Sequence, residues 1–354
     1  MNDIISTEWI NEPLATLDSG SEKAARHRQT LLTKPAGSLG LLEEIAIRLA
    51  ALQGTTQPTI ERIHIAIFAG DHGVAAEGVS AFPQSVTSEM IKNFANGGAA
   101  ISVLANAINA TLDLINMGTA HETGPLDDVT NVNLGPGTAN FTLEPAMTTS
   151  QLIQSLAAGH DVVEGARFAD TQLFIGGEMG IANSTSASAL ACMLLNASPS
   201  QLTGPGTGLS SDGIAHKIMV VQSAIDLHSE AADSPLEVLR RVGGFEIAAL
   251  AGAYIRCAQA GLPVVVDGFI ATTAALAAEQ IKPGVKDWLL FSHRSTEPGH
   301  HVVLEALDAT PYLDLGLHLG EGSGAAVLVP LLQLACSLHN EMATFIEASV
   351  STSI

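Results

Sequence analysis

The stretch Ile63-His64-Ile65-Ala66-Ile67-Phe68-Ala69-Gly70-Asp71-His72-Gly73 decides the fold class of this chain. An apolar run of strand length leads directly into two polar residues that glycines flank on both sides. In doubly wound α/β folds, ligands bind where parallel strands end in such a turn. We therefore expect residues 63–69 to form a buried parallel strand and the turn after it to face a ligand.

The same pattern recurs along the rest of the chain. Each further run is short and apolar and ends in polar residues or glycine, and segments of helix length separate most of the runs. This alternation predicts an α/β protein with a Rossmann-like, open, mostly parallel sheet flanked by helices. The further runs are 112–117, 171–175, 262–266, 289–291 and 312–319, and the expected helices include 213–228, 235–259 and 272–280.

Polar side chains follow most of these expected strands. Because the carboxyl ends of parallel strands meet at one edge of a sheet, side chains that are distant in sequence can converge there. The residues in question are Asp71, Glu178, Asp267, Ser292 and Glu321. The sequence therefore predicts one site, built mainly from carboxylates, at this edge.

Glu321 has the most distinctive surroundings of these residues. It lies in Leu317-His318-Leu319-Gly320-Glu321-Gly322-Ser323-Gly324, among three glycines and before a long apolar run. Glycine lets a backbone approach a ligand closely, which favours a functional carboxylate. An acid in the first turn of a helix also complements the helix dipole, with Ser323 as a cap. Spacing alone leaves both interpretations open.

The most glycine-dense loop, 204–212, precedes an expected helix that carries Lys217. Backbone N–H groups at a helix start bind phosphate, and a lone lysine supplies the opposite charge. A structural turn is the alternative. The loop is not a P-loop, and no G-x-G-x-x-G follows a strand, so dinucleotide binding has no support.

Composition narrows the function further. The 354 residues carry a net charge of −21 with only 15 Lys and Arg, which argues against binding to nucleic acid or to an anionic membrane surface. The three cysteines are far apart and are expected to be reduced and buried, which is typical of a cytoplasmic protein. The N-terminal segment carries acids, unlike a signal peptide, and no apolar run is long enough to span a bilayer.

Two other site types receive little support. His293, His300 and His301 lack the spacing of a known metal-ligand set, and the neighbouring Arg294 would repel a cation. A Ser-His-Asp hydrolase is disfavoured because no G-x-S-x-G is present. We expect no metal and no cofactor.

Seven motifs occur in an order that resembles one enzyme family, the nicotinate-nucleotide:dimethylbenzimidazole phosphoribosyltransferases of cobalamin biosynthesis. The resemblance extends from about Leu31 to Met342. The motifs are Thr33-Lys34-Pro35-Ala36-Gly37-Ser38-Leu39-Gly40, Phe68-Ala69-Gly70-Asp71-His72-Gly73-Val74, Gly176-Gly177-Glu178-Met179-Gly180-Ile181-Ala182-Asn183, Val242-Gly243-Gly244-Phe245, Val266-Asp267-Gly268-Phe269, Ser292-His293-Arg294-Ser295 and Leu319-Gly320-Glu321-Gly322-Ser323-Gly324.

The resemblance implies a specific reaction and architecture. The family transfers the 5-phosphoribosyl group of nicotinate mononucleotide to 5,6-dimethylbenzimidazole, which gives α-ribazole 5′-phosphate and nicotinate with inversion at the anomeric carbon. Family members are homodimers and need no metal. The implied domains are a large catalytic α/β domain at 60–330 and a small helical domain from both chain ends, 1–59 and 331–354.

The resemblance also assigns residues. Glu321 is the expected general base, and Glu178 a second carboxylate near the ribose or base. Lys217 and Ser292 are expected to anchor the phosphate together with Gly206, Thr207 and Gly208. The acceptor base is expected against Ser80, Phe82, Met90, Leu319 and Gly320, and Asp267 and Thr185 complete the substrate-binding set.

The preferred acceptor stays open because relatives accept other benzimidazoles, purines or phenolics. Two alternatives to the transferase are a catalytically silent nucleotide-binding regulator on the same scaffold and a nucleotide glycohydrolase that needs no acceptor base.

Overall fold

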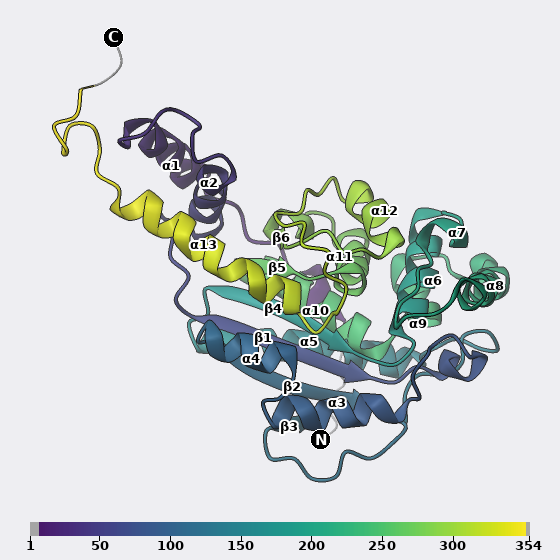
Figure 1. The fold of residues 1–354 in the computed structure, drawn as a ribbon. Helices are drawn as coiled ribbons and strands as arrows, with labels where there is room; N and C mark the ends of the chain where they lie inside the picture. The colour runs from purple at the N-terminus through teal and green to yellow at the C-terminus, as the bar shows by residue number, and fades with distance from the viewer. Residues whose placement is uncertain (1–6, 352–354) are drawn as a thin grey trace.

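The computed structural model describes residues 7–351 and contains one six-stranded sheet. All five pairs of neighbouring strands are parallel, in the order β3-β2-β1-β4-β5-β6 (Figure 1). The expected Rossmann-like parallel sheet is confirmed. The strands are β1 (Ile63–Gly70), β2 (Thr111–Gly118), β3 (Val129–Asn131), β4 (Leu173–Met179), β5 (Val264–Val266) and β6 (Leu289–Phe291).

The sequence prediction was wrong at both edges of the sheet. Residues 312–319 are not a strand: the segment runs beside β6 and makes one isolated bridge, between His293 and Leu313. Gly316 has a φ of +69°, which turns the backbone out of the extended conformation. The strand at the other edge is β3, which is three residues long and mostly exposed, so it has no apolar pattern to detect.

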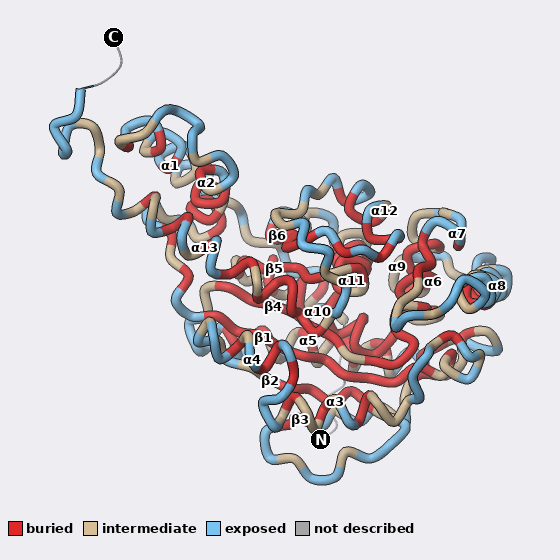
Figure 2. The backbone as a smooth tube through the Cα atoms, in the orientation of Figure 1, coloured by how far each residue is buried: buried red, intermediate tan, exposed pale blue. Residues whose placement is uncertain are grey.

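Helices cover both faces of the sheet, and β1 is buried along its whole length (Figure 2). Helices α5 and α10 pack so closely that a Cβ on Gly159 would lie 1.9 Å from the carbonyl oxygen of Ala249. One face is covered by α5 (Thr149–Phe168), α10 (Phe245–Ala260) and α11 (Phe269–Ile281), and the other by α3 (Ser85–Ala95), α4 (Ala100–Ala107) and α13 (Ser323–Glu341).

The expected helix 235–259 is interrupted. Gly243 and Gly244 separate α9 (Pro235–Val242) from α10, and a Cβ on Gly244 would lie 2.3 Å from the ring of His72. The break brings the start of α10 against the turn after β1. The helices near the carboxyl ends of the strands are α6 (Asn183–Leu195), α7 (Pro199–Leu202), α8 (Ser211–His228), α9 and α12 (Pro298–Ala306).

The two chain ends pack against each other, away from the sheet (Figure 1). Helices α1 (Ser19–Leu31) and α2 (Leu41–Gln53) lie beside the C-terminal half of α13. Arg28 joins them by donating to the carbonyl oxygens of His339 and Asn340, at 2.6 and 2.9 Å.

The division into domains at 59/60 and 330/331 remains a prediction, and α13 continues unbroken across residue 330. Residues 1–6 and 352–354, which the predicted small domain includes, lie outside the described residues. Within residues 7–351, no helix combines the length and apolar character needed to cross a membrane.

Candidate active site

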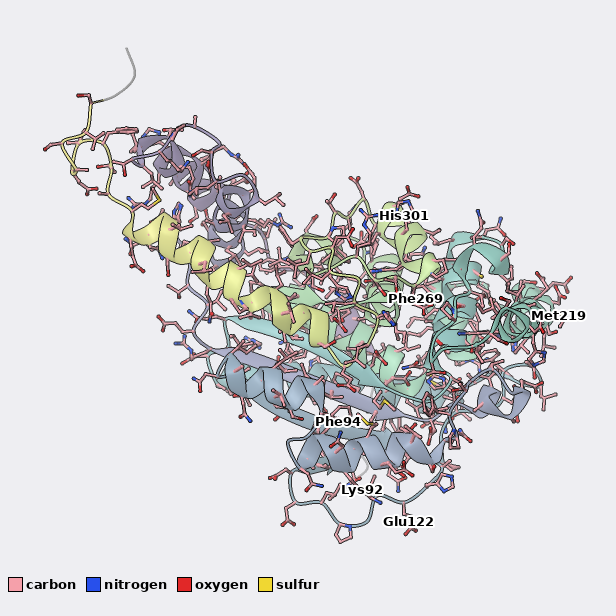
Figure 3. All side chains as sticks on the ribbon, in the orientation of Figure 1. Lys92, Phe94, Glu122, Met219, Phe269 and His301 are labelled. Atoms are coloured by element: carbon pink, nitrogen blue, oxygen red, sulfur yellow. The ribbon has the colours of Figure 1, made fainter. Side chains whose placement is uncertain are left out.

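A cavity of about 670 Å³ lies where β4, β5 and β6 end. The loops after these strands form its walls together with the glycine loop before α8, and Phe269, labelled in Figure 3, lies on one wall. Seven residues that the sequence predicted for the site line this cavity: Phe82, Glu178, Gly206, Thr207, Gly208, Leu319 and Gly320.

A buried amine lies directly behind one end of the cavity. The Nζ atom of Lys217 donates to Ser184 Oγ at 2.9 Å and to the carbonyl oxygen of Gly204 at 3.3 Å. Burial lowers the pKa of Lys217 to about 8, and the nearby charge of Glu297 partly offsets this effect. Lys217 is on α8 and reaches back to the glycine loop, where a Cβ on Gly206 would lie 3.2 Å from Nζ. This end of the cavity suits an anion.

Glu321 lies at a sharp backbone turn just before α13. Its φ is +63°, and those of Gly320 and Gly322 on either side are +90° and +77°. The left-handed conformation is unfavourable for a glutamate, and such strain is concentrated at functional sites. The residue is only 6% exposed, and its Oε2 atom is buried without a hydrogen-bond partner. Burial raises the pKa of Glu321, and the backbone N–H of Ile101 partly offsets this effect.

Asp267, at the end of β5, holds this turn in place. Its Oδ2 atom accepts the backbone N–H of Gly322 at 3.0 Å, and Oδ1 accepts that of Ala325 at 3.1 Å. Burial raises the pKa of Asp267 to about 6 even though these N–H groups favour the charged form. The sequence predicted a substrate-binding role, whereas the structure places both oxygens on the backbone that follows Glu321.

Glu178, at the end of β4, lines the cavity beside Gly320. Burial raises its pKa well above the usual range, and the charges of Glu246, Asp267 and Glu321 add to the effect. The side-chain amide of Asn183 donates to its Oε2 atom. The environment therefore favours the uncharged acid over the carboxylate.

The predicted acceptor loop meets the glycine loop. Thr207 Oγ1 lies 3.3 Å from Ser80 Oγ and accepts the backbone N–H of Ala81 at 3.2 Å. Phe82 and Leu319 both line the cavity and are 52% and 61% exposed, so their apolar side chains are available to a flat ring. Predicted residues from three separate segments thus lie together.

Seven predicted residues do not themselves line the cavity. Four of them lie directly behind residues that do: Lys217 bonds to Ser184, Ser80 lies beside Thr207, Glu321 follows Gly320 and Asp267 precedes Gly268. The other three are Ser292, Thr185 and Met90. Ser292 is buried with Oγ 2.9 Å from Nδ1 of His293, and Thr185 is buried in α6. Met90 is half-buried on α3. Serine and threonine are common at helix starts and strand ends for structural reasons, and the sequence does not show which way each points.

Several residues that line the cavity were not predicted for the site: Asn183, Ser184, Phe269, His293, Ser295, Thr296 and Glu297. The continuous polar run from Ser292 to Glu297 directly after β6 is the signal that could have identified several of them. His293 was considered only as a metal ligand, and within residues 7–351 no cluster of three or more His, Cys, Asp or Glu side chains is arranged to hold a metal ion.

Comparison with known proteins identifies the family. The family model of the phosphoribosyltransferase family DBI_PRT matches residues 14–350. A relative from Azotobacter vinelandii named nicotinate-nucleotide:dimethylbenzimidazole phosphoribosyltransferase is 59% identical over 345 residues, which are 97% of this chain and 98% of that protein. The chain belongs to this phosphoribosyltransferase family.

Further relatives agree with this family assignment. A protein of the same name from Xanthomonas oryzae is 56% identical over 347 residues, covering 98% of this chain and 99% of the relative. The crystal structure of a family member from Thermus thermophilus superposes with a TM-score of 0.90 at 42% identity, covering 95% of this chain and all of the other. The resemblance seen in the motifs is confirmed, and the chain is an enzyme of this phosphoribosyltransferase class.

Proposed function

We propose that this enzyme transfers the 5-phosphoribosyl group of nicotinate mononucleotide to 5,6-dimethylbenzimidazole or a related base, as a step in making the lower ligand of cobalamin. The observation that carries the proposal is the buried Oε2 atom of Glu321, which has no hydrogen-bond partner. It belongs to the turn whose neighbour Gly320 lines a cavity with an anion-binding end. Such an oxygen is available to take a proton from a substrate.

The donor phosphate would bind at the end of the cavity nearest to Lys217. Gly206, Thr207 and Gly208 line this part of the cavity, where the Gly206 N–H now donates to Glu297, and the Lys217 amine behind them supplies the positive charge. Holding the phosphate away from the reacting carbon uses remote binding energy to orient the ribose. Ser292 and Thr185 are left out of this anchor because the Ser292 hydroxyl faces the ring of His293 and Thr185 is fully buried in α6.

The acceptor base would lie between the loop of residues 78–83 and Leu319, with one ring nitrogen facing the ribose and the other facing Glu321. The first nitrogen attacks the anomeric carbon, and the bond from that carbon to the nicotinate nitrogen breaks. The bonding electron pair leaves with nicotinate. The N–H on the second ring nitrogen then becomes acidic, and Glu321 accepts its proton.

The raised pKa values fit these roles. A base works best when its pKa is close to the working pH, and burial moves Glu321 in that direction. Glu178, kept uncharged by burial and by the neighbouring acids, can donate a hydrogen bond to the ribose without repelling the anionic donor. The two glutamates thus have different roles in neighbouring positions.

The test is product analysis with the purified protein. Nicotinate mononucleotide with 5,6-dimethylbenzimidazole should give nicotinate and α-ribazole 5′-phosphate in equal amounts, and the sugar product should have the α configuration. Nicotinate release that does not require an added base would instead indicate a glycohydrolase. Saturable nucleotide binding without any nicotinate release would indicate a silent binding protein. A panel of bases, at a fixed donor concentration, then identifies the preferred acceptor.

We also propose a cytoplasmic homodimer. The three cysteines are free and buried, which suits a reducing compartment. Leu31, Leu41 and Leu334 lie on the helices of the two chain ends and are between 41% and 59% exposed, which provides apolar surface for a second copy. Sedimentation of the purified protein tests the assembly.

A further inference from the structure

Glu297 places a carboxylate at the phosphate end of the cavity. Its Oε1 atom accepts the backbone N–H of Gly206 at 2.9 Å. Its Oε2 atom lies against Gly204, where an added Cβ would be 2.1 Å away. Glu297 comes from the segment after β6, so it crosses from one wall of the cavity to the other. The glycine loop therefore already holds an anion.

The same carboxylate is the acid that supports the charge of Lys217. The two hydrogen-bond acceptors of the Lys217 amine, a serine hydroxyl and a backbone carbonyl, are both neutral. Glu297 contributes the Coulombic effect that favours the protonated amine against burial. In the free protein, Glu297 thus interacts with both groups to which the phosphate of the proposed function would bind.

We propose that Glu297 is a specificity-determining residue that takes the place of the donor phosphate in the free enzyme. This inference rests on the proposed function, because it assumes that the donor phosphate binds at Lys217 and Gly206. An incoming phosphate must displace the carboxylate from the Gly206 amide and overcome its negative charge.

The consequence is discrimination among anions. A full nucleotide offsets the displacement of Glu297 with contacts from its ribose and base, whereas inorganic phosphate has no such contacts. Selectivity of this kind comes from a repulsive group built into the site and not from better contacts to the correct ligand. The free cavity would therefore stay empty of small anions until the nucleotide arrives.

The experiment compares Glu297→Gln with the unaltered enzyme. Glutamine keeps an oxygen for the Gly206 N–H but removes the charge. Titration calorimetry with inorganic phosphate at pH 7, in a buffer free of other multivalent anions, should show binding about tenfold tighter in the variant. The KM for nicotinate mononucleotide should change less than the dissociation constant for phosphate. Glu305→Gln on α12, where the glutamate is exposed and paired with His301, is the matched control and should change neither.

Unchanged or weaker phosphate binding in Glu297→Gln would overturn the inference and make Glu297 a clamp that only holds the loop. Glu297→Asp provides a second variant, because the shorter side chain withdraws from Gly206, and it should also bind phosphate more tightly.

Lys217→Ala separates this inference from the proposed function. If Lys217→Ala binds nicotinate mononucleotide as tightly as the unaltered enzyme, the proposed anchor is wrong. If Lys217→Ala weakens nucleotide binding while Glu297→Gln gains no affinity for phosphate, only the role of Glu297 is wrong.

Discussion

A buried carboxylate can act as a base only if its charged form is not already neutralised by a partner. Glu321 meets this condition, since no cation pairs with it among the described residues and one of its oxygens has no partner at all. The cost is a glutamate in the left-handed backbone region. At the residue scale, the proposed base is thus a carboxylate with one oxygen left free to accept a proton.

The protonation of Lys217 and that of Glu321 predict how the activity depends on pH. Its pKa of about 8 means that the amine is charged below pH 8 and loses its charge above it. Because phosphate binding needs the charged form, kcat/KM for the donor should fall as the pH rises through about 8. As the proposed base, Glu321 must be deprotonated, so its raised pKa should limit the rate on the acid side, above the usual glutamate range.

A pH profile of kcat/KM, measured with the donor as the varied substrate, checks both the fall on the acid side and the fall on the alkaline side (the alkaline limb). In Lys217→Arg the alkaline limb should move beyond pH 9, because arginine stays protonated throughout. An alkaline limb that remains near 8 in this variant would show that another group is responsible for it.

At the scale of elements, the site depends on how each strand ends and on the loop or helix that comes after it. Asp267 follows β5 and accepts backbone N–H groups at the start of α13, which fixes the turn that carries Glu321 just before that helix. The carboxylate therefore connects two elements that are distant in sequence. Its effect on catalysis should come through the position of the base and not through contact with substrate.

Asp267→Asn should separate positioning from binding. Asparagine has one acceptor oxygen for two N–H groups, so one of them loses its partner, at a cost in folding stability of about 1–3 kcal/mol. The base would shift, and kcat should fall by about 10- to 100-fold while the KM for the donor changes little. Steady-state kinetics and thermal unfolding measure the two effects.

Asp18→Ala is the matched control for helix capping. Asp18 accepts the backbone N–H of Ser21 at 2.7 Å at the start of α1, far from the cavity. Its loss should lower stability by about 1 kcal/mol without changing kcat. A kcat reduced equally in both variants would mean that Asp267 acts only through global stability.

Periodicity and strand-end residues predicted most of the fold. The strand from Ile63 was recognisable because both of its faces are buried, and its apolar pattern is continuous. The short polar strand β3 carries no such signal, and the segment 312–319 has the composition of a strand but turns at Gly316. The composition of a segment therefore does not show whether it pairs with the edge of the sheet as a strand.

The candidate site was predictable in location but not in detail. Glu178 and the glycine loop before α8 lie at the cavity because strand ends and helix starts converge there by topology. Ser292 and Thr185 were predicted for the same reason and yet point into the interior. The direction of a side chain depends on packing between elements, and Glu297 lines the cavity only because the segment after β6 folds back toward the glycine loop.

At the scale of the whole molecule, the enzyme is strongly acidic but acts on an anionic donor. It carries 36 acidic residues against 15 Lys and Arg, for a net charge of −21. The long-range field therefore opposes the approach of the donor, and the attraction of Lys217 acts only within the cavity. Salt screens the long-range repulsion more than the local attraction of Lys217, because exposed charges are screened more than buried ones.

Raising the KCl concentration from about 0.01 M to 0.15 M should increase kcat/KM for the donor by about two- to fivefold, since the Debye length falls from about 30 Å to 8 Å. The KM for the neutral acceptor base serves as an internal control and should stay constant. A kcat/KM that decreases with salt would show that a local positive field guides the donor to the cavity.

If Glu321 is the base, as we propose, the turnover of Glu321→Gln must fall. Glutamine keeps the size of the side chain but cannot accept the proton. We predict that kcat falls by about 10²- to 10⁴-fold, while the binding of nicotinate mononucleotide and of 5,6-dimethylbenzimidazole, measured by calorimetry, is retained. Turnover of the variant at the rate of the unaltered enzyme would show that Glu321 does not accept the proton.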